Sequence, residues 1–123
     1  DSICERMLTR VATSAGPNVQ AFHALAKEYS LKSFAYEGGV DMQQYAVGYD
    51  AKYAAQYDPR MGQAVEGYLD HYYAGGGDAM FYFVLTCKYS KFGYWGLTED
   101  IDDLAAPKYQ AAVRVSEMLN AKK

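Results

Sequence analysis

Apolar residues recur at helical spacing in four stretches of the chain. The stripes are Ile3, Met7, Leu8 and Val11; Val19, Phe22, Ala26 and Tyr29; Met61, Val65, Tyr68, Leu69 and Tyr72; and Ala112, Val115, Met118 and Leu119. Because residues three or four positions apart share one face of a helix, each stripe predicts an amphipathic helix. The first helix should span residues 2–13, and a break at residues 14–17 should precede a second helix that begins at Pro17.

Proline and glycine mark where the later helices begin and end. Asp58-Pro59 is a typical helix start, and the three glycines at 75–77 should end that helix. Pro107 should open the last helix, after a long loop over residues 86–106. The acidic run at 99–103 within this loop is typical of a solvated loop or of the segment that precedes a helix.

Tyrosine recurs every four residues at Tyr45, Tyr49, Tyr53 and Tyr57. This spacing places the four rings along one face of a further helix. A tyrosine usually buries its ring against apolar neighbours and keeps its hydroxyl in contact with water. This behaviour favours packing of the tyrosine face against another helix. The alternative is a surface that faces a sugar or a partner.

Two short apolar segments predict buried strands, at Leu31–Tyr36 and at Ala79–Leu85. The helical segments between them favour a parallel pair joined by a crossover. Parallel sheets are normally covered on both faces, and two strands do not make a complete one. Either further strands lie within segments that look helical, or the remaining strands come from elsewhere.

Length and charge set bounds on the class of protein. The 123 residues with 50% hydrophobic content suffice for one domain, so residues 1–123 should form a single unit. The 12 basic and 15 acidic residues are interspersed and leave a net charge of −3. Binding to nucleic acid depends on an excess of Lys and Arg that neutralises the phosphates, and this chain has none, so no nucleic-acid role is expected.

Membrane, metal and cofactor sites are not predicted either. The longest apolar run, residues 79–87, is about half the length of a membrane-spanning helix. The first residues lack the pattern of a signal peptide, so a targeting segment should have been removed or should lie outside this sequence. Cys4 and Cys87 fit one disulfide or two buried thiols equally well, and neither has a second ligand at metal spacing. The sequence has no Gly-rich phosphate loop, no nucleophile elbow and no metal-binding helix motif, and no cofactor is expected.

Glu37 is the best candidate for chemistry. It follows the first apolar segment and precedes Gly38 and Gly39, which would let the backbone approach a ligand closely. Side chains just past the carboxyl end of a buried strand occupy the active-site position of α/β folds. A carboxylate there serves glycoside cleavage when a second carboxyl group lies about 5 Å away or farther. No partner carboxylate is evident, and Glu37 would otherwise cap a helix or pair with a lysine.

A set of short motifs adds a resemblance to this interpretation. The motifs are Tyr36-Glu37-Gly38-Gly39, Asp58-Pro59-Arg60-Met61, Gly75-Gly76-Gly77, Tyr94-Trp95-Gly96-Leu97 and Pro107-Lys108-Tyr109-Gln110-Ala111. Together they resemble the C-terminal part of secreted, extracellular glycoside-hydrolase-like (β/α)8 barrels. The resemblance implies an α/β fold in which the two strands are the last two of the barrel. A full barrel needs about 250 residues, so other polypeptide chains would have to complete it.

The resemblance also implies roles for individual residues. Glu37 matches the nucleophile of such barrels, whereas the acid/base from an earlier strand has no counterpart in this sequence. Trp95 matches an aromatic platform under a sugar ring, and Tyr36 and Tyr94 would shape the same site. The expected function is therefore hydrolysis or binding of a glycoside, with enzymatic activity left open. A non-catalytic structural or binding protein derived from such a barrel is the alternative, and a small helical binding module is a third possibility.

Overall fold

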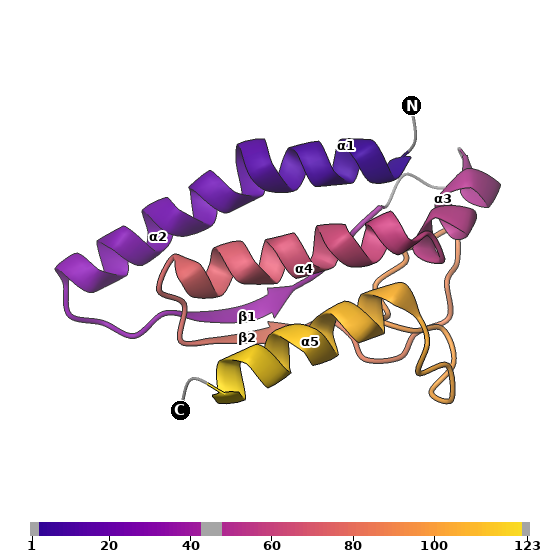
Figure 1. Ribbon diagram of the computed structural model, residues 1–123. Coiled ribbons are helices and arrows are strands. Elements are labelled where there is room, and N and C mark those ends of the chain that lie inside the picture. Colours follow the sequence, from indigo (N-terminus) through magenta and orange to yellow (C-terminus); the bar gives the residue numbers. More distant parts are fainter. Residues whose placement is uncertain (1–2, 43–47, 122–123) are drawn as a thin grey trace.

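The computed structural model describes residues 3–42 and 48–121 (Figure 1). Helical residues outnumber strand residues in this part of the chain. The elements are α1 (Ile3–Arg10), the π-helical turn η1 (Val11–Ala15), α2 (Gly16–Glu28), β1 (Phe34–Gly38), α3 (Tyr49–Gln56), α4 (Pro59–Ala74), β2 (Ala79–Tyr82) and α5 (Pro107–Ala121).

The two strands form a two-stranded parallel sheet. Phe34 pairs with Ala79 at one end of the sheet, and Gly38 pairs with Tyr82 at the other. Helices α3 and α4 lie between the strands in the sequence. The expected parallel pairing of the two apolar segments is therefore confirmed, although both strands are shifted or shortened by a few residues. The expectation that both strands are buried is wrong, because their residues are exposed or half-buried.

The expected C-terminal strand-helix repeats of a (β/α)8 barrel are wrong for this chain. In a barrel, an outer ring of helices packs against a closed sheet. Here helix α4 packs mainly against other helices, which are α5, α1 and α2. The described residues form a small, mostly helical domain with two parallel strands, and no barrel repeat is evident in them.

The expected break before Pro17 is instead a π-helical turn. The N–H of Gly16 donates to the carbonyl of Val11, five residues back. Proline has no N–H and disrupts the regular bonding of a helix interior, and a local π adjustment is one way to absorb such an irregularity. Helices α1 and α2 consequently run as one bent rod in Figure 1.

The start and stop signals of the later helices are confirmed. The Asp58 carboxylate accepts from the N–H of Arg60 at 2.9 Å, which caps the start of α4. Helix α4 ends at Ala74, directly before the glycines at 75–77, and α5 begins at Pro107. None of the described helices is long and apolar enough to cross a membrane.

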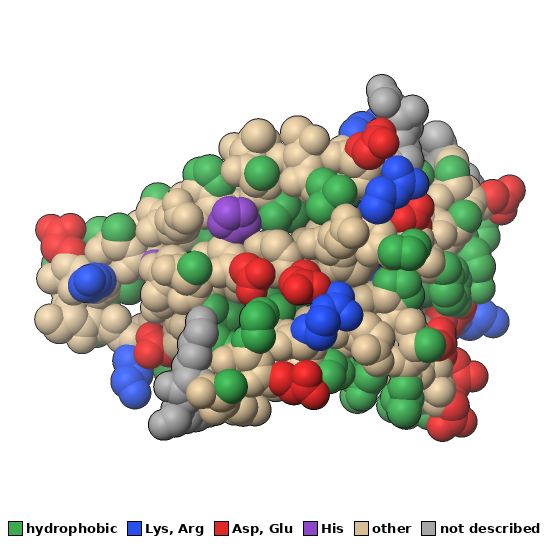
Figure 2. Space-filling view, in the orientation of Figure 1, with side chains coloured by type: hydrophobic (Ala, Val, Ile, Leu, Met, Phe, Trp, Pro, Cys, Tyr) green, Lys and Arg blue, Asp and Glu red, His purple; other side chains and the backbone are tan. Residues whose placement is uncertain are grey.

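Helix α4 also holds the sheet. The Tyr72 hydroxyl accepts from the N–H of Ala35 at 2.8 Å and donates to the carbonyl of Ala79 at 2.6 Å, so one side chain joins both strands. Tyr72 is buried, as are Met61, Val65 and Leu69 on the same helix. Helices α4 and α5 pass in front of the sheet in Figure 1, and Figure 2 shows charged side chains scattered over this helical face.

The tyrosine face packs against the loop at 83–106 rather than against another helix. The hydroxyls of Tyr53 and Tyr57 both donate to the carboxylate of Glu99, at 2.7 and 2.8 Å. The expected packing role is therefore correct for these two rings, while the expected partner is wrong and Tyr45 lies outside the described residues. Glu99 is half-buried and accepts these hydrogen bonds, whereas the acidic run at 99–103 was expected to be solvated. Both cysteines are free thiols.

Candidate functional site

A bulge in β1 determines where Glu37 points. Between the Ala35 and Gly38 pairings, two residues of β1 face a single residue of β2. The extra residue breaks the usual alternation of side chains, and both Tyr36 and Glu37 are exposed. Bulges often lie next to active sites, where they redirect a side chain. Glu37 is thus carried to the open side of the sheet, at the carboxyl end of β1.

Glu37 lies on the wall that two adjoining hollows share. The first has a volume of about 210 Å³ and is lined by Glu37, Gly38, Gly39, Val40, Asp41, Phe83 and Trp95. The second has a volume of about 330 Å³ and is lined by Tyr36, Glu37, Phe81, Tyr82 and Phe83. We call the first of these the Glu37 hollow. Three of the residues predicted from the sequence therefore line these two adjoining hollows, Glu37 and Trp95 in the first and Tyr36 and Glu37 in the second.

The outer side of the sheet is an exposed aromatic face, made of Phe34, Tyr36, Phe81 and Phe83. Their exposed fractions are 56%, 89%, 65% and 45%. With about 200 Å² per fully exposed ring residue, this aromatic face presents about 500 Å² to solvent. Patches of this size are near the upper end for a monomer and are often functional.

Trp95 is held beside Phe83 by the loop that follows β2. The two rings meet edge to face, with centroids 6.1 Å apart. The backbone around them is paired, since the N–H of Val84 donates to the carbonyl of Trp95 at 3.3 Å. A Cβ at Gly93 would lie 2.4 Å from the indole, so only glycine lets the ring rest against the loop. The position of Trp95 is therefore fixed by its own loop.

Tyr94 does not reach the hollow. Its side chain is 1% exposed, and its hydroxyl donates to the carbonyl of Tyr49 at 3.3 Å. Its backbone carbonyl accepts a hydrogen bond from the buried ammonium of Lys108 at 2.8 Å. Tyr94 is thus a core residue that anchors the loop behind its neighbour Trp95.

Asp41 and Phe83 are the site residues that the sequence analysis missed. Asp41 places a second carboxylate on the wall of the Glu37 hollow, four residues after the first. The available signal was its position in the segment that leaves the strand directly after the two glycines. Phe83 lay within an apolar run and looked like a core residue, yet it is 45% exposed.

Buried polar groups hold the loop that carries Trp95. The ammonium of Lys108 donates to Gln56 and to the Tyr94 carbonyl, both at 2.8 Å, and burial lowers the pKa of Lys108 to about 7. Burial raises the pKa of Glu99, but hydrogen bonds from the two tyrosine hydroxyls and from the N–H of Tyr89 outweigh it and leave that pKa lowered. The base of the loop is therefore fixed on two sides.

Comparison with known proteins assigns no family to the chain. No family model matches it, and neither the curated proteins nor the solved structures give a match. Within residues 3–42 and 48–121, no group of three or more His, Cys, Asp or Glu side chains is arranged to hold a metal ion. The function is accordingly inferred from the geometry of the site.

Proposed function

We propose that this chain binds a glycoside at the Glu37 hollow. The observation that carries the proposal is the meeting of two carboxylates, Glu37 and Asp41, with the rings of Phe83 and Trp95. A sugar ring has an apolar C–H face that packs on aromatic rings, and hydroxyls that donate to carboxylate oxygens. The wall of the Glu37 hollow thus offers both aromatic and carboxylate groups to a ligand.

The adjoining hollow supports a ligand longer than one sugar ring. It shares Glu37 and Phe83 with the Glu37 hollow and continues past Tyr36 and Phe81 along the aromatic face. A chain of sugars could therefore lie across the carboxyl ends of both strands, with Glu37 near its centre. The substrate class that fits is an oligosaccharide.

Hydrolysis of the glycoside is a second candidate because Asp41 lines the same hollow as Glu37. In a retaining mechanism Glu37 would attack the anomeric carbon while Asp41 protonates the leaving oxygen, and water would then release the sugar. Carboxyl groups about 5 Å apart suit retention, and a separation of about 6.5–9.5 Å suits inversion. Both carboxylate residues are exposed to solvent, which favours binding over catalysis in this chain alone.

Binding to another polypeptide is a further candidate, supported by the sheet. The described residues pair each strand on one edge only, and a parallel sheet is normally covered on both faces. A partner chain would add strands and cover the aromatic face. The extracellular location expected from the resemblance stays a prediction.

Calorimetric titration with cello-, xylo- and chito-oligosaccharides tests the glycoside proposal. Glu37→Gln keeps the shape but removes the charge, and should weaken binding by about tenfold or more. Trp95→Ala removes a stacking ring and should weaken binding by a similar factor. Glu117→Gln on α5 and Phe92→Ala in the loop are the matched controls, since both are exposed and lie outside the hollows.

Unchanged affinity in both Glu37→Gln and Trp95→Ala would refute the site. Chromatography of the sugars after long incubation separates hydrolysis from binding. If Glu37 is a nucleophile, Glu37→Gln should lower turnover by several orders of magnitude.

A further inference from the structure

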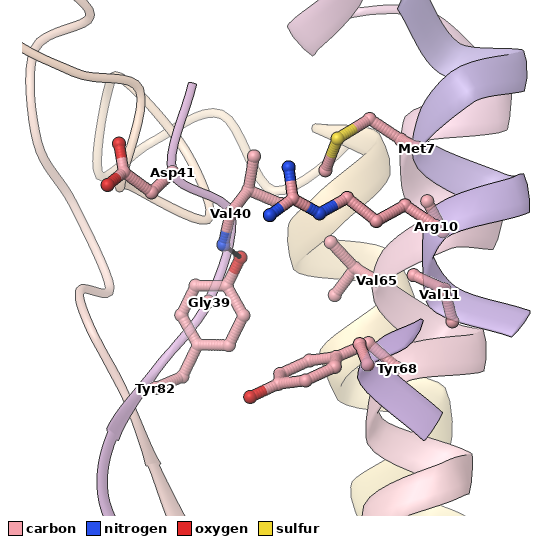
Figure 3. Close-up of a pocket in the computed structure, with 11 residues that line it drawn as sticks. Met7, Arg10, Val11, Gly39, Val40, Asp41, Val65, Tyr68 and Tyr82 are labelled. Atoms are coloured by element: carbon pink, nitrogen blue, oxygen red, sulfur yellow. Dashed lines mark hydrogen bonds between the residues drawn. The ribbon is translucent and has the colours of Figure 1, made fainter. Parts of the chain in front are cut away.

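A further cavity of about 460 Å³ lies between the helices and the segment that leaves β1 (Figure 3). Its walls come from α1, η1 and α4, from Tyr82 of β2, and from residues 39–41, which also line the Glu37 hollow. A volume of about 300–1,000 Å³ is usual for small-molecule sites. The cavity is therefore large enough for a ligand of its own.

Most of the wall is apolar. Met7 and Val11 contribute from the first helical rod and Val65 from α4, and Figure 3 shows these side chains facing the same space. Val11 and Ala15 are the first and last residues of the π-helical turn, and both line the cavity. Turns of this kind occur frequently at functional sites. The π-helical turn thus forms part of the wall of this cavity.

The polar side chains that the helices and β2 contribute to the cavity are hydrogen-bond donors. Figure 3 shows the guanidinium of Arg10 and the ring of Tyr68 reaching from the helices toward the segment after β1. The Tyr82 hydroxyl accepts from the N–H of Val40 at 3.2 Å and keeps its own proton to donate. Burial raises the pKa of both phenols, so each remains a neutral donor at neutral pH.

The charge of Arg10 is not neutralised by any of the ion pairs found in the described ranges, which join Arg60 and Arg114 to acidic residues. Asp41 lies at the rim, but its carboxylate points away from the guanidinium in Figure 3. A cavity lined by a cation and two phenol donors suits an anion, and guanidinium groups bind carboxylates with paired hydrogen bonds.

We propose that this cavity binds a small monocarboxylic acid with a short apolar body. Its carboxylate accepts hydrogen bonds from Arg10 and Tyr68, and its hydrocarbon part packs among Met7, Val11 and Val65. The site is independent of the glycoside proposal, because none of these five residues lines either of the two hollows at Glu37.

Amide NMR titration with sodium hexanoate tests this site, with 1-hexanol and sodium acetate as matched probes. Hexanoate should bind with a Kd of about 0.1–1 mM and shift the resonances of residues 7–15 and 64–68. Hexanol lacks the charge and acetate lacks the tail, so each should bind at least about tenfold more weakly. Raising the salt concentration should weaken hexanoate more than hexanol.

Substitution of single residues tests which side chains contact the carboxylate of hexanoate. Arg10→Met should raise the Kd for hexanoate about tenfold or more, and Tyr68→Phe by a smaller factor, without changing the affinity for hexanol by as much. Arg6→Met removes the same charge from the same helix outside the cavity and should leave the Kd unchanged. Arg10 is exposed, so its replacement should not unfold the chain.

Three outcomes would overturn the proposal. They are equal affinities for hexanoate and hexanol, an Arg10→Met variant that binds hexanoate as well as the Arg6→Met control, and no shift at residues 7–15 up to high millimolar hexanoate. Loss of oligosaccharide binding with hexanoate binding intact would affect only the glycoside proposal.

Discussion

At the scale of single residues, the buried side chain of Lys108 connects several parts of the fold. It has no exposed surface, and its ammonium lies 4.5 Å from the centre of the Tyr89 ring as well as bonding to Gln56 and to the Tyr94 carbonyl. It therefore joins α5, α3 and the loop that carries Trp95. Burying a charge is costly even when it is hydrogen-bonded, which is why the pKa falls to about 7.

The pH dependence of unfolding should report this burial. The pKa of Lys108 is about 7 in the folded chain and returns to its ordinary value of 10.5 on unfolding. Between these values the unfolded chain binds more protons, so stability should rise with pH. We expect a gain on the order of 1–2 kcal/mol from pH 7 to pH 8.5 in urea unfolding. Cys4 and the tyrosines have raised pKa values, and their opposing effects begin only at higher pH.

Lys108→Met should remove most of this slope, whereas Lys27→Met, at an exposed lysine of α2, should keep it. An equal slope in both variants would show that another group is responsible.

A candidate site residue could be predicted from the sequence when its immediate neighbours along the chain indicated its role. Glu37 could be predicted because it precedes two glycines at the edge of an apolar segment, whereas Trp95 was named only through the resemblance to barrel enzymes. Asp41 was missed because its position beside Glu37 depends on the path of the chain after β1. Lys108 was missed as a buried residue because lysine is almost always exposed, and nothing near it in the sequence supplies its acceptors.

At the scale of elements, helices α4 and α5 meet closely at Gly62. A Cβ added there would lie 2.7 Å from the carbonyl oxygen of Pro107, which belongs to the backbone. At Gly67, in the same helix, an added Cβ would lie 3.6 Å from a methyl group of Val11, an ordinary contact. The two glycines therefore differ in what surrounds them, although both are in the interior of α4.

Alanine at these two positions should have opposite effects. Gly62→Ala should lower the free energy of unfolding by about 1–3 kcal/mol, because the helices must separate or shift. Gly67→Ala should leave it unchanged or raise it by up to about 1 kcal/mol, since alanine favours the helix. Urea unfolding of the two variants side by side checks this, and equal changes would mean that α4 and α5 do not pack as described.

Helix limits were predictable because proline, glycine and a capping carboxylate act locally, as Asp58 does for α4. The π-helical turn was not, since Pro17 equally suits the start of a new helix. The bulge at Tyr36 and Glu37 was not predictable either, because it depends on the register with β2.

At the scale of the whole molecule, one side of the sheet is covered and the other is open. Met80 and Tyr82 pack against the core on the covered side, whereas the aromatic face is exposed. The barrel expectation failed because short motifs fix local turns and strand ends without fixing how many strands pair. The open side carries the aromatic face and the two hollows on which the glycoside proposal rests.

An exposed aromatic face should associate at high concentration. We expect sedimentation velocity to show self-association at concentrations of roughly 100 μM. Phe81→Lys should reduce it, because Phe81 lies in the aromatic face and is 65% exposed. Phe22→Lys is the control, since Phe22 is 54% exposed on α2. Equal association of the two variants would place the contact elsewhere.

The fluorescence of Trp95 tests the glycoside proposal most directly. Trp95 is the only tryptophan in the chain, and it lines the Glu37 hollow. Selective excitation of the indole therefore reports on this hollow alone. Titration with an oligosaccharide should shift the emission and saturate, and Glu37→Gln should move the midpoint to at least about tenfold higher sugar concentration. An emission spectrum that stays constant over the whole series of oligosaccharides would contradict glycoside binding at this site.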